Sequence, residues 1–135
     1  MEQIKQRFGG TERLYGKSAT AVLAQSHVCV VGIGGVGCWV AEALARSAVG
    51  NITLIDLDDI CVTNTNRQIH ALHSTVGNAK VTEMQQRILD INPDCQVHTI
   101  EDFVTPDNVA DMMSKQYSYM VDATDSIKAK ASMIA

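Results

Sequence analysis

The chain has 135 residues, 46% hydrophobic and 19% charged, which suits one globular domain with a core and excludes a disordered chain. Its formal net charge of −4 at pH 7 gives no bulk preference for nucleic acid or an anionic membrane. The sequence has no apolar run long enough to span a bilayer, no signal-peptide pattern and no zinc-ligand spacing among its cysteines. We therefore expect a cytoplasmic protein with reduced thiols, with membrane association through sequence beyond Ala135 left open.

Helices and strands are predicted to alternate along the chain. A helical lead-in at residues 1–25, interrupted at Gly9–Gly10 and Gly16, precedes the first strand. Strands are predicted at residues 27–31, 52–57, 96–100 and 117–121. Helices are predicted at residues 36–48, at 78–91, from Thr105–Pro106 onward and from residue 126, while residues 58–77 are irregular. This alternation predicts an α/β fold with a Rossmann-like, doubly wound, mainly parallel sheet and helices on both faces.

Two helices carry apolar residues at helical spacing. One predicted buried face consists of Val36, Val40, Ala43, Leu44 and Ala48, and the other of Val81, Met84, Ile88 and Ile91. The last apolar helix, at residues 126–135, has no C-cap glycine. We therefore expect this chain to be the N-terminal part of a larger domain.

A glycine loop follows the first strand. Gly32, Gly34 and Gly37 form a G-x-G-x-x-G pattern between an apolar strand and a helix, which is the context that this motif needs. Glycines allow the backbone to approach a ligand, and the N-terminus of a helix offers unpaired N–H groups to an anion. The pattern predicts a phosphate-binding loop.

The end of the second strand offers a ribose-binding carboxylate. Asp56 lies 19 residues after Gly37, where a Rossmann-type domain places an acid on the ribose hydroxyls. These two features alone favour a nicotinamide-dependent oxidoreductase. Arg67 and Lys80 add cations for β- and γ-phosphates, and Asp122 or Asp125 offers oxygens to Mg²⁺, so the whole set favours a nucleoside triphosphate.

These motifs together resemble the adenylation domain of the E1-like superfamily, which includes ubiquitin-activating enzymes and adenylyltransferases of molybdopterin and thiamine pathways. The resemblance runs from about Arg7 to the end of the chain. It rests on Gly32-x-Gly34-Gly35-x-Gly37, Asp56-Leu57-Asp58, Asn64-x-x-Arg67-Gln68, Val76-Gly77-x-x-Lys80 and Asp122-Ala-Thr-Asp125. The lead-in at residues 9–16 and the stretch at 64–68 are most similar to the tRNA threonylcarbamoyladenosine dehydratases within this superfamily.

The resemblance implies a division into a lead-in at residues 1–25 and an ATP-binding, Rossmann-like adenylation domain at 26–135. Its implied nucleotide-binding residues are Gly32, Gly34, Gly35, Gly37, Asp56, Asp58, Asn64, Arg67, Gln68 and Lys80. Arg67, Lys80 and Asp125 are implied as catalytic, with Asp125 holding Mg²⁺ and Arg67 reaching across the interface of a homodimer. Arg7 or Arg13 is a further candidate for the partner's site.

The implied reaction is ATP-dependent adenylation of a carboxylate. The leading substrate is the threonylcarbamoyl group of modified adenosine in tRNA, which then cyclises with net loss of water. The alternatives are adenylation of the C-terminus of a ubiquitin-like or sulfur-carrier protein, a nicotinamide-dependent oxidoreductase, and a non-catalytic nucleotide-binding module. Expected partners are a second copy of the chain, tRNA, and a cysteine desulfurase or sulfur-acceptor protein; Lys115, Lys128 and Lys130 are candidates for tRNA contact.

The remaining reactive side chains are expected to be structural. Residues predicted to pack in the core are Cys29, Cys38, Cys61, Trp39, Met112, Met113 and Met120. His70 and His73 follow Arg67 and are expected at the surface, with a place at the mouth of the substrate site as the alternative, and Cys95 is expected in a loop without a partner.

Overall fold

The computed structural model describes residues 2–112, 116–124 and 133–134, with side chains from Gln6 onward. Within these ranges four strands form one parallel sheet in the order β3-β2-β1-β4: β1 (His27–Val31), β2 (Asn51–Ile55), β3 (Gln96–Ile100) and β4 (Tyr119–Asp122). Val31 at the carboxyl end of β1 pairs with both Ile55 and Asp122. The chain moves outward to β3 and returns to β4, so the winding reverses between β1 and β4.

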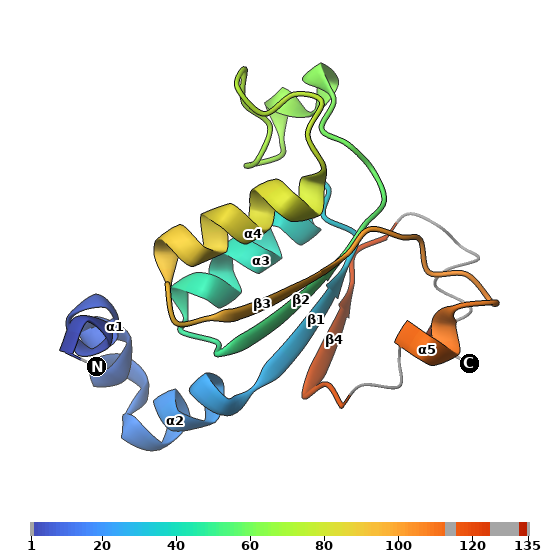
Figure 1. Cartoon of the computed structure of the whole chain (residues 1–135). Helices are drawn as coiled ribbons and strands as arrows, with labels where there is room; N and C mark the ends of the chain where they lie inside the picture. The colour runs from blue at the N-terminus through green and yellow to red at the C-terminus, as the bar shows by residue number, and fades with distance from the viewer. Residues whose placement is uncertain (1, 113–115, 125–132, 135) are drawn as a thin grey trace.

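Helices cover both faces of this sheet. α3 (Gly37–Arg46) and α4 (Lys80–Ile91) lie side by side on one face, and α5 (Val109–Met112) lies on the other (Figure 1). β1 and β2 are buried along almost their whole length, as parallel strands covered on both faces must be. The doubly wound α/β fold predicted from the sequence is confirmed.

Two helices precede the sheet, α1 (Glu2–Tyr15) and α2 (Lys17–Gln25). The break predicted at Gly16 is confirmed, since this residue has a φ of 90°. The break predicted at Gly9–Gly10 is wrong, because α1 runs through both glycines. A glycine costs a helix about 1 kcal/mol, and docking of buried Phe8 and a hydrogen bond from Arg7 to the Ile91 carbonyl outweigh that cost.

The buried face of α3 agrees with the predicted one only in part. Ala48 is buried and Val40 and Leu44 pack against the core, but Ala43 is exposed and Val36 is 65% exposed. The buried residues of α3 are Gly37, Cys38, Ala41, Glu42 and Ala45. Small side chains allow α3 to approach β1 closely, and this close contact overrides the apolar spacing. The predicted face of α4 is confirmed for Val81, Met84 and Ile88.

The segment between β2 and α4, predicted as irregular, is an organised loop. It contains η1 (Val62–Asn66) and projects beyond the carboxyl ends of the strands (Figure 1). Its base is closed by hydrogen bonds from Ile60 N to Asn78 O (2.8 Å) and from Gly77 N to Ile60 O (2.8 Å). A further bond, from Lys80 N to Asp58 O (3.1 Å), holds the start of α4 beside the end of β2.

The elements after β3 are shorter than predicted. The Asn108 side chain accepts the Thr105 N–H at 2.8 Å, so a turn occupies residues 106–108 and α5 follows it. The predicted helix at 126–135 falls outside the described residues, apart from residues 133–134. Across the described part of the chain, no helix has the length and apolar character needed to cross a membrane.

Candidate functional site

The carboxyl ends of the strands open onto a cavity of about 960 Å³. Its walls come from the glycine loop after β1, the end of β2, the η1 loop, the start of α4, and the segments after β3 and β4. The structure brings together every predicted nucleotide-binding residue except Gly37: Gly32, Gly34, Gly35, Asp56, Asp58, Asn64, Arg67, Gln68 and Lys80. The strand-end rule for parallel sheets accounts for this convergence.

Two glycines are required by the fold itself. Gly32 has a φ of 89°, and a Cβ added there would lie 2.8 Å from the Ala123 carbonyl oxygen. A Cβ on Gly37 would lie 1.6 Å from the Gly32 carbonyl oxygen. Gly37 therefore lets α3 begin directly against the loop, although it does not line the cavity.

Gly34 and Gly35 leave room on the cavity side. A Cβ at either position would meet only ordinary contacts, 3.7 Å from Gln68 Nε2 and 3.5 Å from Arg67 Cδ. Among the described residues, the backbone N–H groups of Gly34, Gly35 and Val36 donate to no acceptor. Three successive unpaired N–H groups at the start of a helix are the arrangement that suits an anion.

Asp56 ties the glycine loop to the end of β2. Its Oδ2 accepts the Ile33 N–H at 2.7 Å, and its Oδ1 accepts the Asp58 N–H at 2.8 Å. A carboxylate has about four acceptor positions, so lone pairs remain for the hydroxyl groups of a sugar.

The polar residues in and directly after η1 have both structural and cavity-facing members. Asn64 is buried, and its side chain caps η1 by accepting the Cys61 N–H at 2.9 Å. Arg67 extends over Gly35 and donates to Asn66 Oδ1 at 3.0 Å. Gln68 is 5% exposed, and its Oε1 has no hydrogen-bond partner within the described residues. This amide oxygen can therefore accept a hydrogen bond from a polar group in the cavity.

Lys80 is the first residue of α4 and is only 7% exposed. It lines the cavity, and no carboxylate among the described residues pairs with its ammonium group. Burying an unpaired charge is costly, and an anion in the cavity would remove that cost. Cations and N–H groups suit phosphates while Asp56 suits a sugar, so one cavity can hold both parts of a nucleotide.

The predicted metal ligand Asp125 lies outside the described residues, one position beyond Thr124, which lines the cavity. Within the described ranges no three His, Cys, Asp or Glu side chains are placed to hold a metal ion. The sequence analysis missed the wall formed by Asp102, Phe103 and Thr105. These residues directly follow β3, so the same strand-end rule could have found them.

Several predictions for reactive side chains can be compared with the structure. Cys29, Cys38 and Met112 are buried as predicted, and burial raises the pKa of the Cys38 thiol. Cys95 lies in the loop between α4 and β3 as a free cysteine, as predicted, and it is buried there, which raises its pKa to about 11. Three core predictions are wrong: Cys61 is exposed on a loop, Trp39 is exposed on the outer side of α3, and Met120 is exposed on the edge strand β4. Met113 and the lysines 115, 128 and 130 lie outside the described residues.

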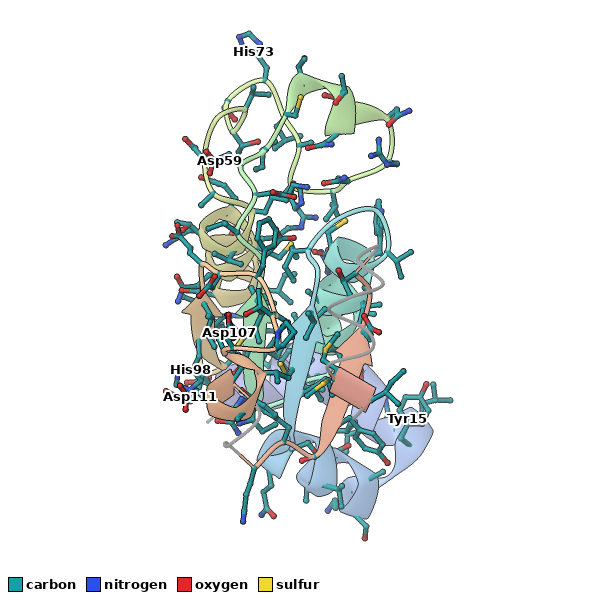
Figure 2. The ribbon with its side chains drawn as sticks, turned by 90° about the vertical axis from the view of Figure 1, so that its right-hand side faces the viewer. Tyr15, Asp59, His73, His98, Asp107 and Asp111 are labelled. Atoms are coloured by element: carbon teal, nitrogen blue, oxygen red, sulfur yellow. The ribbon has the colours of Figure 1, made fainter. Side chains whose placement is uncertain are left out.

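His70 and His73 both lie between η1 and α4, but they differ in their exposure to solvent. His73 lies at the outer tip of the loop, as predicted (Figure 2). His70 was predicted at the surface but is 3% exposed, with its Nε2 2.8 Å from the Ile33 carbonyl oxygen. This buried hydrogen bond to the glycine loop explains why His70 leaves the surface.

Burial lowers the pKa of His70 from 6.5, against the hydrogen bond to the Ile33 carbonyl, which raises it; Lys80 acts in the same direction as burial, while Asp56 and Glu83 oppose it. The unfolded chain therefore takes up a proton at a higher pH than the folded one does. We predict that the free energy of unfolding falls as the pH drops below 6.5, by up to about 1.4 kcal/mol per pH unit for this group. Urea titrations at several pH values check this, with His70→Gln flattening the pH dependence; an unchanged slope in that variant would contradict it.

Comparison with known proteins places this chain in a family. The ThiF family model matches residues 10–134. The tRNA threonylcarbamoyladenosine dehydratase of Escherichia coli strain K12 is 63% identical over 97% of this chain and 49% of its own length. The enzyme of the same name from Haemophilus influenzae is 53% identical over 100% of this chain and 52% of its own.

A solved structure of an enzyme with the same name also matches this chain. The crystal structure of the E. coli dehydratase in complex with ATP matches with a TM-score of 0.98 at 61% identity, over 99% of this chain and 55% of that one. The chain thus spans about half the length of the curated relatives it matches. Since the family match covers almost all of the sequence and confirms the E1-like resemblance, the chain belongs to the ThiF family.

Proposed function

We propose that the cavity binds ATP and that the protein adenylates a carboxylate. The observation that carries this proposal is Lys80, a buried cation that faces the cavity with no carboxylate partner among the described residues. It lies in the same cavity as the unpaired N–H groups of Gly34 and Gly35. The printed description of the similar E. coli structure, a complex with ATP, supports the same ligand.

Each cavity residue then has a role that its geometry supports. Gly34 and Gly35 receive phosphate oxygens, and Gly37 allows the loop to turn beside them. Asp56 accepts the ribose hydroxyls, and Lys80 neutralises the β- and γ-phosphates. The other proposed contacts with the nucleotide come from Asp58, Asn64 and Gln68.

Arg67 acts within its own chain in this proposal. The resemblance implied a role across a dimer interface, but Arg67 lies over Gly35 of the same chain and lines the same cavity. From that position its guanidinium can contact the triphosphate without a partner subunit. Arg7 and Arg13 remain the candidates for a contribution in trans.

Mg²⁺ would be held by the triphosphate and by Asp125. Magnesium in nucleotide sites is usually bound by one or two carboxylates together with phosphate oxygens and water, so a cage of three protein ligands is not needed. Asp102 offers a second carboxylate on the cavity wall. When bound, the ion would neutralise charge on the departing pyrophosphate.

The proposed substrate is the threonylcarbamoyl group of modified adenosine in tRNA, as the names of the similar dehydratases indicate. A carboxylate oxygen attacks the α-phosphorus of ATP and pyrophosphate leaves, which forms an acyl adenylate. The neighbouring carbamoyl group then attacks the acyl carbon, loses a proton and displaces AMP. The ring closes with net loss of water, and the protein's contribution is mainly positioning and neutralisation of charge.

We also propose that the protein works as a homodimer. The loop around η1 and the start of α3 carry exposed apolar side chains: Val36 65%, Trp39 51%, Val62 67%, Leu72 52% and Val76 41%. A second copy would remove these side chains from water. Sedimentation that gives a monomer at micromolar concentration would contradict this. A sulfur-acceptor partner or cysteine desulfurase stays a prediction from the sequence.

ATP–pyrophosphate exchange tests the proposed reaction. We expect exchange that requires threonylcarbamoyl-modified tRNA and is lost in Asp125→Ala, because removal of the metal ligand blocks departure of pyrophosphate. Asp107→Ala is the matched control, since Asp107 is an exposed aspartate outside the cavity. Exchange with a carrier-protein C-terminus instead of tRNA would favour the alternative substrate. Absence of exchange with either substrate would contradict adenylation.

A further inference from the structure

His70 joins the loop after η1 to the middle of the glycine loop. Its Nε2 lies 2.8 Å from the Ile33 carbonyl oxygen, and a carbonyl can only accept, so Nε2 carries the proton. Nδ1 is buried and has no hydrogen-bond partner among the described residues. The single hydrogen bond to Ile33 is therefore what the imidazole contributes to its surroundings.

Ile33 is held from both sides. Its N–H donates to Asp56 Oδ2 at 2.7 Å, while its carbonyl accepts from His70. Its side chain is fully buried, with 0% exposure. Side chains from two other segments therefore fix the orientation of both peptide units that meet at this residue.

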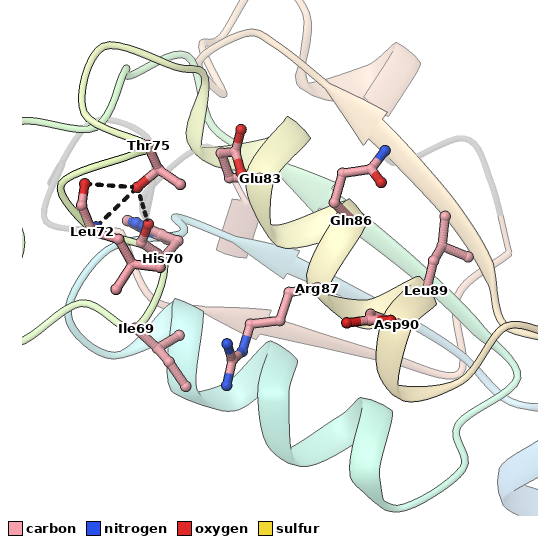
Figure 3. A pocket seen from close by; sticks show the side chains of 9 residues that line it. All are labelled: Ile69, His70, Leu72, Thr75, Glu83, Gln86, Arg87, Leu89 and Asp90. Atoms are coloured by element: carbon pink, nitrogen blue, oxygen red, sulfur yellow. Dashed lines mark hydrogen bonds between the residues drawn. The ribbon is translucent and has the colours of Figure 1, made fainter.

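The carbonyl of Ile33 and the N–H of Gly34 belong to the same trans peptide, so they point in opposite directions. His70 does not line the nucleotide cavity; it borders a second cavity of about 480 Å³ beside α4 (Figure 3). Gly34 does line the nucleotide cavity, and its N–H has no acceptor among the described residues. A carbonyl drawn toward His70 turns the Gly34 N–H toward the nucleotide side.

We propose that His70 is a positioning residue for the nucleotide: its Nε2–H holds the Ile33 carbonyl so that the Gly34 N–H faces a phosphate oxygen. This inference rests on the proposed ATP site and adds to it a residue that the nucleotide does not touch. Without the histidine bond, the Ile33–Gly34 peptide can rotate, and the donor is no longer fixed before the phosphate arrives.

The position of His70 is itself fixed by its backbone. Thr75 Oγ1 donates to the His70 carbonyl at 2.5 Å and accepts the Leu72 N–H at 2.9 Å (Figure 3). These bonds close the turn that carries the imidazole. They do not involve the ring, so a substitution of the side chain can leave the turn in place.

Two substitutions distinguish the effect of losing the hydrogen bond from the effect of losing the volume of the ring. His70→Leu replaces the ring with an apolar side chain of similar size and removes the donor, whereas His70→Gln keeps an N–H donor. We expect the dissociation constant for ATP to rise about ten-fold in His70→Leu, the loss of one hydrogen bond, and to stay within about three-fold in His70→Gln. Ile88→Val is a control for general loss of core packing, because Ile88 is buried in α4 and lies outside both cavities.

Calorimetric titration of each variant with ATP and Mg²⁺ gives these constants, and an unchanged constant in His70→Leu overturns the inference. An equal loss of ATP affinity in His70→Gln also overturns the inference. If the unsubstituted protein binds no ATP, the proposed function fails separately. In that case the NMR resonance of the Gly34 amide, recorded without nucleotide, tests the inference. A shift in His70→Leu but not in His70→Gln supports the oriented peptide, and no shift in His70→Leu overturns it.

Discussion

Replacing Lys80 with methionine is expected to abolish useful ATP binding while leaving the nucleotide-free protein at least as stable as before. Lys80 is 7% exposed at the start of α4 and faces the cavity without a carboxylate partner among the described residues. Removing one member of a buried, hydrogen-bonded charge pair typically costs 2–5 kcal/mol, so we expect ATP to bind more than about 100-fold more weakly. Methionine fills a similar volume without a charge, which removes the cost of burying the ammonium group.

Calorimetry and thermal unfolding of the same samples measure both effects. Because Lys80 is assigned to the β- and γ-phosphates, the affinity for AMP is expected to change by less than about three-fold. Lys17→Met is the matched control, since Lys17 is exposed on α2 and lies outside the cavity. Equal losses of ATP and AMP affinity would place Lys80 elsewhere on the nucleotide. Lower stability together with lost binding would indicate that Lys80 has a structural role.

The glycines of the loop are expected to separate into two classes when each is replaced by alanine. Gly37→Ala should destabilise the fold by about 4 kcal/mol or more, because its Cβ would lie 1.6 Å from the Gly32 carbonyl oxygen. Gly34→Ala and Gly35→Ala should leave stability within about 1 kcal/mol, since their added Cβ atoms meet nothing closer than 3.5 Å. The last two variants should bind ATP about 100-fold more weakly, because the methyl group occupies the phosphate position.

Chemical denaturation and ATP titration of the three variants test this separation. Gly77→Ala is a useful comparison, because Gly77 has a φ of 93° but no atom within 4 Å of an added Cβ. Its effect should be confined to backbone strain in the loop. Normal ATP affinity in both Gly34→Ala and Gly35→Ala would show that the phosphates lie elsewhere.

The convergence of the site could be predicted from the sequence because it depends on local rules. A glycine motif between a strand and a helix fixes the phosphate loop, and parallel strands bring their carboxyl ends to one edge. Asp56, Asn64, Arg67 and Lys80 therefore line one cavity although 24 residues of sequence separate the first from the last. The strand and helix positions followed from apolar periodicity in the same way.

Two of the wrong predictions concern residues whose exposure is set by contacts with residues distant in the sequence. Apolar spacing placed Val36 in the core, but close packing of α3 on β1 selects small residues and leaves Val36 65% exposed. His70 was expected at the surface, yet it is buried, with its ring hydrogen-bonded to the Ile33 carbonyl, 37 residues away. Cys61 lies between two apolar residues but remains exposed, and the Thr63 hydroxyl lowers the pKa of its thiol. The contacts that set the exposure of Val36 and His70 have no local sequence signal.

Titration of the protein with ATP and with NAD, each in the presence of Mg²⁺, tests the central claim most directly. Lys80 and Arg67 in one cavity with the glycine loop predict that ATP binds and that NAD binds at least about 100-fold more weakly, because a dinucleotide lacks the γ-phosphate and needs fewer cations. Saturable ATP binding that weakens in Lys80→Met would support a triphosphate site. Equal or tighter binding of NAD would contradict a triphosphate site and would favour the alternative hypothesis, a nicotinamide-dependent oxidoreductase.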